Sequence, residues 1–493
     1  MSKELLMLVV FFAFSSLCFG QSKIDMKDVN AMNARFNGTL RNNPANPNYF
    51  TDNSGKAVYL TGSHTWAVLQ EISSDPNPVE IFDYKAYLDM MESHNHNFLR
   101  FWYFEQPSKA CWSDGPTYFD PLPYQRSGTG MALDGLPKFD LEKWNEVFFT
   151  RLRSRLIEAG NKGIYVSVML FQGFSMNIHR NPKSDPWITN PYNPKNNIKG
   201  IGAADSIPDD DVHATVHSLK NTELLKVQEK YVAKIIETVN DLDNVLYEII
   251  NEGGATDWQH HMIDFIHNYE KKMSKQHAVG MTARISSDFH NFMLYESKAD
   301  WVSPRNTAME NYRENPPASK YNKVIVPDTD HLWGHGGNYK WVWKSFTRGL
   351  NPIFMDAWGP LGFKTEQFPK MLLQGGIWKD TRDYPDWEPI RQNLGYTKVY
   401  ADKIDLANMF PHDELATTGY CLANPGNEYL VYFPEGGNAV LDLTRAPGKY
   451  SVEWFFPLLN LTLTGETYMK GGKLEDFISP FTGDAVLYIK KRE

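Results

Sequence analysis

Carboxyl-bearing residues end two short apolar segments of the chain, and their types suit acid–base chemistry. Glu252, preceded by Asn251, ends one segment, and Asp328 and Asp330 end another. Hydrolysis of a glycosidic bond needs two carboxyl groups, one to protonate the leaving oxygen and one to attack the sugar or activate water. We therefore predict Glu252 and Asp330 as the catalytic pair. Side chains alternate along a strand, so Asp328 shares a face with Asp330 and is the alternative second carboxylate.

Further polar and aromatic side chains at segment ends are candidates for binding the substrate. They are Asn251, Arg100, His64, Trp66, Trp102, Gln172, Asp328, His331, Trp333 and Trp358. Arg100 is expected to neutralise a buried carboxylate. The tryptophans fit core packing and sugar stacking equally well. Glu248 lies in the middle of its segment, and we interpret it as a hydrogen-bonded structural residue.

Eight short apolar segments alternate with helical patterns and must position these residues. The segments are 58–66, 97–104, 163–170, 244–252, 278–282, 300–303, 323–330 and 352–358. The helical patterns cover 79–93, 140–159, 222–239, 258–273 and 339–350, and the second begins at a capping Asp140. This alternation predicts an α/β fold, a parallel (β/α)8 TIM barrel, whose catalytic residues lie at the C-terminal ends of strands. An open doubly wound sheet is the alternative, but no glycine-rich nucleotide fingerprint follows any segment.

The chain after residue 405 has a different pattern. Short β-like segments cover 428–433, 439–443, 450–455 and 485–489, and glycine-containing turns separate them. We therefore predict a barrel domain over 21–404 and a small antiparallel β-sandwich domain over 405–493.

The first twenty residues resemble a secretory signal. Lys3 precedes an apolar run, and cleavage after Gly20 fits the small-residue rule. No later stretch reaches 18 apolar residues, so we expect no membrane span and a secreted or periplasmic protein. Cys111 and Cys421 are predicted to be buried free thiols.

The composition limits the partners of the protein. The 493 residues carry a formal net charge of −9, which argues against nucleic acid as a partner. Hydrophobic residues at 42% and charged residues at 22% exclude a disordered chain. Neither a metal ion nor an organic cofactor is required by two-carboxylate chemistry, and no Cys/His spacing indicates zinc. The oligomeric state stays open.

The order of these features resembles clan A glycoside hydrolases. An Arg on the second strand, Asn-Glu after the fourth, a carboxylate after the seventh and a Trp after the eighth carry the resemblance. Segments 59–66, 138–144 and 247–252 are similar to apiosidase-like bacterial enzymes. Segments 418–426 and 432–437 are similar to a small β domain, named for collagen binding, that is often fused to them. We infer no collagen binding from that name.

The resemblance implies roles for individual residues. Glu252 matches the general acid/base, Asn251 the residue that holds the sugar 2-hydroxyl, and Arg100 the arginine that orients the nucleophile. The clan has Glu on strand seven, whereas this chain has Asp330, which is shorter by about 1.5 Å. Retaining enzymes separate their carboxyls by about 5–5.5 Å and inverting enzymes by about 6.5–9.5 Å, so the shorter side chain favours inverting geometry.

The sequence therefore predicts a secreted glycoside hydrolase acting on a plant, algal or other polysaccharide or oligosaccharide. A non-catalytic carbohydrate-binding or cell-surface adhesion protein on a barrel scaffold is the main alternative. A lyase that uses His or Tyr as its base is a third.

Overall fold

The structure is a computed structural model. It describes residues 26–76, 82–111, 115–174, 184–202, 216–284, 289–334, 336–359, 382 and 384–492. The predicted signal, residues 1–20, lies outside this described part. Among the described helices, none has the length and apolar character needed to cross a bilayer. Cys111 and Cys421 are both buried free thiols, which confirms that prediction.

All eight predicted barrel strands are present, and all pair in parallel. They are β4 (Gly62–His64), β6 (Phe98–Phe101), β10 (Tyr165–Gln172), β11 (Val245–Asn251), β12 (Val279–Thr282), β13 (Trp301–Ser303), β14 (Val324–Ile325) and β15 (Ile353–Met355). Six form one sheet in the order β14-β13-β12-β11-β10-β6, and β15 pairs with β4. Backbone hydrogen bonds Phe98 N to Thr61 O and Ile353 N to Pro327 O join the pair to both sheet edges. The sheet thereby closes into a ring.

Helices follow most of these strands. They are α2 (Tyr84–Ser93), α3 (Glu146–Gly160), α5 (Thr222–Val239), α6 (Thr256–Glu270), α7 (Phe292–Tyr295), α8 (Thr329–Leu332), α9 (Tyr339–Thr347) and α10 (Glu388–Lys403). The connection 304–323 between β13 and β14 is described throughout and contains no helix, so the regular (β/α)8 repeat is broken there. Pro316 and Pro317 disfavour a helix over the second half of this connection.

A long hairpin replaces the predicted start of the helix at Asp140. Strand β8 (Tyr124–Met131) pairs antiparallel with β9 (Pro137–Trp144), and α3 begins only at Glu146, after its cap Asn145. The prediction that the helix begins at Asp140 is wrong. Apolar Phe139 and Leu141 alternate with polar Asp140 and Glu142, and this alternation of residue types is the strand pattern that the capping interpretation overlooked.

The C-terminal strands form two antiparallel sheets. The larger has the order β16 (Phe410–Pro411), β17 (Cys421–Asn424), β18 (Glu428–Phe433), β23 (Ala485–Lys491), β20 (Lys449–Phe456) and β21 (Leu461–Lys470). The smaller pairs β19 (Asn438–Asp442) with β22 (Leu474–Ile478). One face of the larger sheet, including Val431 and Leu487, packs in a core with Leu441 and Phe477 of the smaller sheet.

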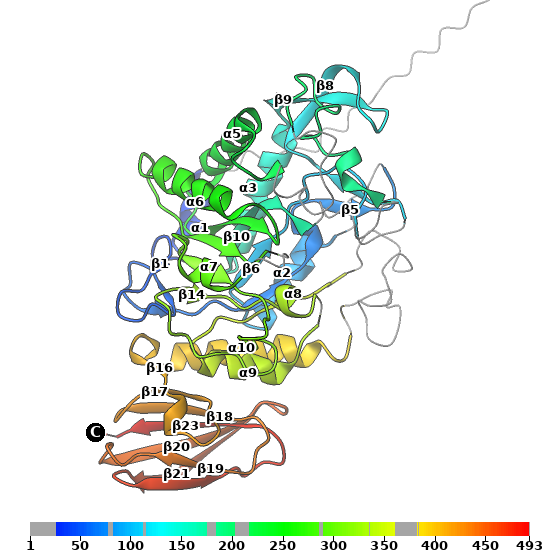
Figure 1. Ribbon diagram of the computed structural model, residues 1–493. Coiled ribbons are helices and arrows are strands. Elements are labelled where there is room, and N and C mark those ends of the chain that lie inside the picture. The colour runs from blue at the N-terminus through cyan, green and yellow to red at the C-terminus, as the bar shows by residue number, and fades with distance from the viewer. Residues whose placement is uncertain are drawn as a thin grey trace, which may run out of the picture.

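The other face of the larger sheet packs on the barrel helices α9 and α10, which lie between the two parts in Figure 1. Trp343 of α9 stacks on Tyr432 with ring centroids 6.1 Å apart. The Tyr400 hydroxyl of α10 donates to Glu453 at 2.9 Å. The central strands β18 and β23 of the larger sheet are therefore covered on both faces, which explains why most of their residues are apolar and buried.

Smaller elements complete the described chain. They are α1 (Met26–Asn33), the antiparallel strands β1 (Arg41–Asn42), β2 (Phe50–Thr51) and β3 (Ala57–Val58), the pair β5 (Glu71–Ser73) and β7 (Tyr118–Asp120), and the 3-10 helices η1 (Trp66–Val68), η5 (Pro186–Ile188), η7 (Leu406–Asn408) and η8 (Asp413–Leu415).

Candidate active site

Arg100, a fully buried residue of β6, lies at the centre of the candidate site. Its Nε and Nη2 donate to the two carboxylate oxygens of Glu248 at 2.8 and 2.5 Å. Nη2 also donates to Oδ1 of Asn251 at 2.7 Å. Nη1 donates to Asp328 at 2.6 Å and to Asp330 at 3.3 Å. One guanidinium thus joins the ends of the second, fourth and seventh barrel strands.

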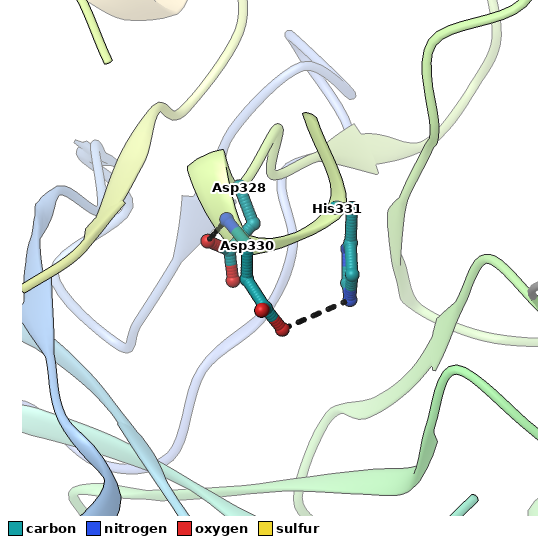
Figure 2. Close-up of side chains that lie close together, drawn as sticks. All are labelled: Asp328, Asp330 and His331. Carbon is teal, nitrogen blue, oxygen red and sulfur yellow. Dashed lines mark hydrogen bonds and ion pairs between the residues drawn. The ribbon is translucent and has the colours of Figure 1, made fainter. Parts of the chain in front are cut away.

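The start of helix α8 separates the two aspartates of the seventh strand. Asp328 is the N-cap, and its Oδ1 accepts the backbone N–H of Asp330 at 2.9 Å. Asp330 is in the first turn, and Figure 2 shows its carboxylate directed toward the ring of His331. Oδ2 of Asp330 and Nε2 of His331 are 3.8 Å apart. The cap holds Asp328 in the wall of the barrel and leaves Asp330 nearer the open end.

Asp328 has a complete set of partners. Besides Arg100, it accepts a hydrogen bond from Nε2 of His64 at 2.9 Å. The indole N–H of Trp102 donates to Nδ1 of His64 at 2.8 Å, so Nδ1 is the acceptor and Nε2 carries the proton. Burial lowers the pKa of His64, which therefore stays neutral.

Asn251 connects the guanidinium to two other predicted residues. Its Oδ1 faces Arg100, so its Nδ2 is the donor, and it donates to Oε1 of Gln172 at 3.3 Å. His331 donates from Nε2 to Asn251 Oδ1 at 3.2 Å and accepts at Nδ1 from Ser303 at 2.8 Å. Burial, with Arg100 nearby, lowers the pKa of His331 to about 3.

The charges of this cluster do not balance. Glu248, Asp328 and Asp330 surround one guanidinium, and both histidines are neutral. Burial and the neighbouring Asp328 raise the pKa of Asp330 to about 7. Asp328 keeps a pKa below its ordinary value, because His64 and Arg100 outweigh its burial. The excess negative charge is thus relieved by a proton on Asp330 in neutral to acidic solution.

Glu252 follows Asn251 at the end of β11 and is buried. Its φ of +55° is left-handed, which is uncommon for a residue other than glycine and is kept only where the surroundings enforce it. The end of β10 lies directly against this turn. Gly173 N donates to Asn251 O at 2.8 Å, and a Cβ on Gly173 would lie 2.3 Å from Cα of Gly253.

The four predicted tryptophans differ in exposure. Trp66, Trp102 and Trp358 are buried, and Trp333 is half-buried. Trp102 stacks on His64 with centroids 5.8 Å apart, and Trp358 packs on Tyr87 at 5.3 Å. Trp333 is therefore the member of this set with the most ring surface left for a ligand.

The donor atoms of Asp328, Asp330 and His331 lie within 4.8 Å of one another, a spacing that a metal ion requires (Figure 2). Arg100 Nη1 bonds both carboxylates, however, and His331 Nε2 is directed at Asn251. A cation would have to displace a guanidinium, so these residues fit an arginine-centred cluster better than a metal site.

Two comparisons report on the fold. A family model described as "Domain of unknown function (DUF6298)" matches residues 109–302, less than half of the chain. A solved structure described as a glycoside hydrolase matches with 11% identity and a TM-score of 0.56, covering 92% of this chain and 97% of that one. The protein shares the fold of a glycoside hydrolase. A family 5 glycoside hydrolase from Bacteroides vulgatus ATCC 8482 agrees, with 13% identity, a TM-score of 0.57 and coverage of 92% and 94%.

A search of curated proteins finds no match. The matched family segment begins after Arg100 and ends before Asp328, so it contains Glu252 but neither the central arginine nor the seventh strand. At 11–13% identity the structural likeness concerns the fold alone.

Two polar residues of the site region were missed from the sequence. Ser303 ends the sixth strand and holds His331, and Glu105 accepts the backbone N–H of Gln172 at 2.9 Å. Glu105 directly follows the segment 97–104, and Ser303 ends the segment 300–303. Selecting polar residues at strand ends, as was done for the other candidates, would have included both.

Proposed function

We propose that the chain is a glycoside hydrolase whose catalytic carboxyl groups belong to Glu252 and Asp330. The observation that carries the proposal is the position of Arg100, which bonds both Asn251, the neighbour of Glu252, and Asp330. Carboxyl groups on two sides of one barrel mouth suit a cationic sugar transition state. Asp328, fully buried and fully paired, is a positioning residue in this proposal.

The proposed roles follow from the surroundings of each group. Glu252 protonates the leaving oxygen, and Asp330, once ionised, attacks the sugar or activates water. Arg100 holds Asp330 and offsets part of its charge. Asn251, Gln172, His331 and Trp333 line the sugar site, and His64 and Trp102 act through Asp328.

The proposal also covers the processing, the domains and the substrate of the protein. It includes secretion after removal of residues 1–20, a catalytic domain over 21–404, an accessory β domain over 405–493, and a polysaccharide or oligosaccharide substrate.

A substrate panel tests the proposal. Purified wild-type protein is incubated with aryl glycosides and with plant and algal polysaccharides, and released sugars are quantified. Glu252→Gln and Asp330→Asn should each lower kcat at least about 100-fold with unchanged circular dichroism, since each removes an acid or base. Glu296→Gln, an exposed residue, is the matched control. Full activity in either site variant contradicts the assignment, and retention on a polysaccharide without sugar release favours the adhesion alternative.

A further inference from the structure

Glu105 and His217 form a buried pair beside the candidate site, and no role described so far uses it. Oε1 of Glu105 accepts from Nε2 of His217 at 3.0 Å and from the backbone N–H of Gln172 at 2.9 Å. The two side chains are 1% and 0% exposed. Within the described part of the chain, Oε2 of Glu105 and Nδ1 of His217 have no hydrogen-bond partner. Each such atom costs about 1–3 kcal/mol, so the pair is not explained by stability alone.

The pair contacts both backbone segments that bound the candidate site. Through Gln172 it holds the end of β10. Through the carbonyl of His217, which accepts from Ala255 N at 2.9 Å, it holds the turn after β11. The His217 ring packs on Phe171 of β10 and Trp258 of α6, with centroids 5.5 and 5.1 Å apart.

Glu252 lies inside the segment held in this way. Its left-handed backbone lies between Asn251, whose carbonyl accepts from Gly173, and Ala255, whose N–H donates to His217. Gly173 and Gly253 are packed backbone to backbone, so a shift at the end of β10 is passed to the turn. A misplacement of about 1 Å can cost a factor of about 100 in rate.

We propose that Glu105 and His217 are positioning residues that hold the turn of Glu252 in its left-handed conformation. The inference rests on the proposed function for its kinetic consequence. Its structural consequence, an ordered turn over 251–255, is independent of any activity.

The test compares three variants. Glu105→Ala removes the acceptor, and we expect kcat to fall about 10- to 100-fold while KM changes less than about threefold. Glu105→Gln keeps an oxygen that accepts from Gln172 and His217, and we expect kcat within about threefold of wild type. His217→Phe keeps the ring packing and loses the donor, and we expect an intermediate kcat. The substrate is the glycoside that the wild-type protein cleaves best in the panel.

Hydrogen–deuterium exchange supplies the readout that needs no activity. In Glu105→Ala, amides of 251–257 should exchange at least about tenfold faster, because Glu105 no longer holds His217, whose carbonyl accepts from the Ala255 N–H. The matched control is Glu270, whose carboxylate is equally buried and pairs with His277 at 2.7 Å before β12, at the other end of the barrel. Glu270→Ala should lower Tm without changing kcat or exchange over 251–257.

Each outcome decides the inference. Unchanged kcat in Glu105→Ala overturns it, and so does a Glu105→Gln variant as inactive as Glu105→Ala, because the charge would then matter rather than the position. If the wild-type protein cleaves no glycoside, the proposed function fails. Exchange over 251–257 then decides the positioning role, and unchanged exchange in Glu105→Ala overturns it.

Discussion

The raised pKa of Asp330 predicts an unusual pH dependence. Asp330 must be ionised to act as nucleophile or base, and its pKa is raised to about 7 by burial and by Asp328. Activity should therefore be lost as pH falls through about 7, rather than near 4 as for an ordinary aspartate. Replacing the neighbour, Asp328→Asn, removes one negative charge and should move this acidic limb downward.

The size of the shift follows from the geometry. Carboxylate oxygens of Asp328 and Asp330 lie within 4.8 Å of each other. Two unit charges at that distance repel by about 3.5 kcal/mol at an effective dielectric constant of about 20, which corresponds to about 2.5 pH units. The acidic limb of the profile should thus move from about 7 to about 4.5. Asparagine still accepts the Asp330 N–H as a helix cap, so α8 should be retained.

The assay is the pH profile of kcat/KM, which reports the free enzyme. Asp356→Asn is the matched control, because Asp356 is also buried and also accepts two bonds from an arginine, Arg391. Asp356→Asn should lower the free energy of unfolding and leave the acidic limb of the pH profile unchanged. A wild-type limb near pH 4, or an unshifted or higher limb in Asp328→Asn, would refute the reasoning.

Four other changes have defined outcomes. The folded-state pKa of Asp330 is raised above 3.8, so the stability that its protonated carboxyl contributes is complete below pH 3.8 and is lost as pH rises through about 7. Asparagine cannot ionise, so Asp330→Asn should raise the urea midpoint of unfolding at pH 8 and leave it unchanged at pH 4. Arg100→Lys replaces five donors by three and should lower kcat at least about 100-fold and Tm by several degrees in a thermal melt. Gly173→Ala places a Cβ 2.3 Å from Cα of Gly253 and should cost about 1–3 kcal/mol in urea unfolding. Truncation after residue 404 exposes the aromatic faces of α9 and α10, so the remaining barrel should aggregate in size-exclusion chromatography. A monodisperse product would show that the barrel does not need the C-terminal sheet.

The barrel strands could be predicted because burial on both faces makes a parallel strand a continuous apolar run. The hairpin over 124–144 was harder to predict, because Asp140 and Glu142 mimic a helix start while Phe139 and Leu141 alternate as in a strand. The connection 304–323 has no helix, in agreement with the helical patterns predicted from the sequence, none of which covers it.

The residue types and strand ends alone predicted that Arg100, Asn251, Glu252, Asp328 and Asp330 lie at one rim, since all parallel strands of a barrel end at the same rim. Only the tertiary structure decided how these groups pair. Asp328, the N-cap of α8, pairs with Arg100 and His64, while Asp330, two residues later in the first turn, has only a 3.3 Å contact with Arg100 and the raised pKa. Such pairing depends on sub-ångström placement across strands far apart in sequence, which local pattern does not encode. His217 could not be found from the sequence for the same reason, because its contacts with Glu105 and Ala255 join segments far apart in the chain.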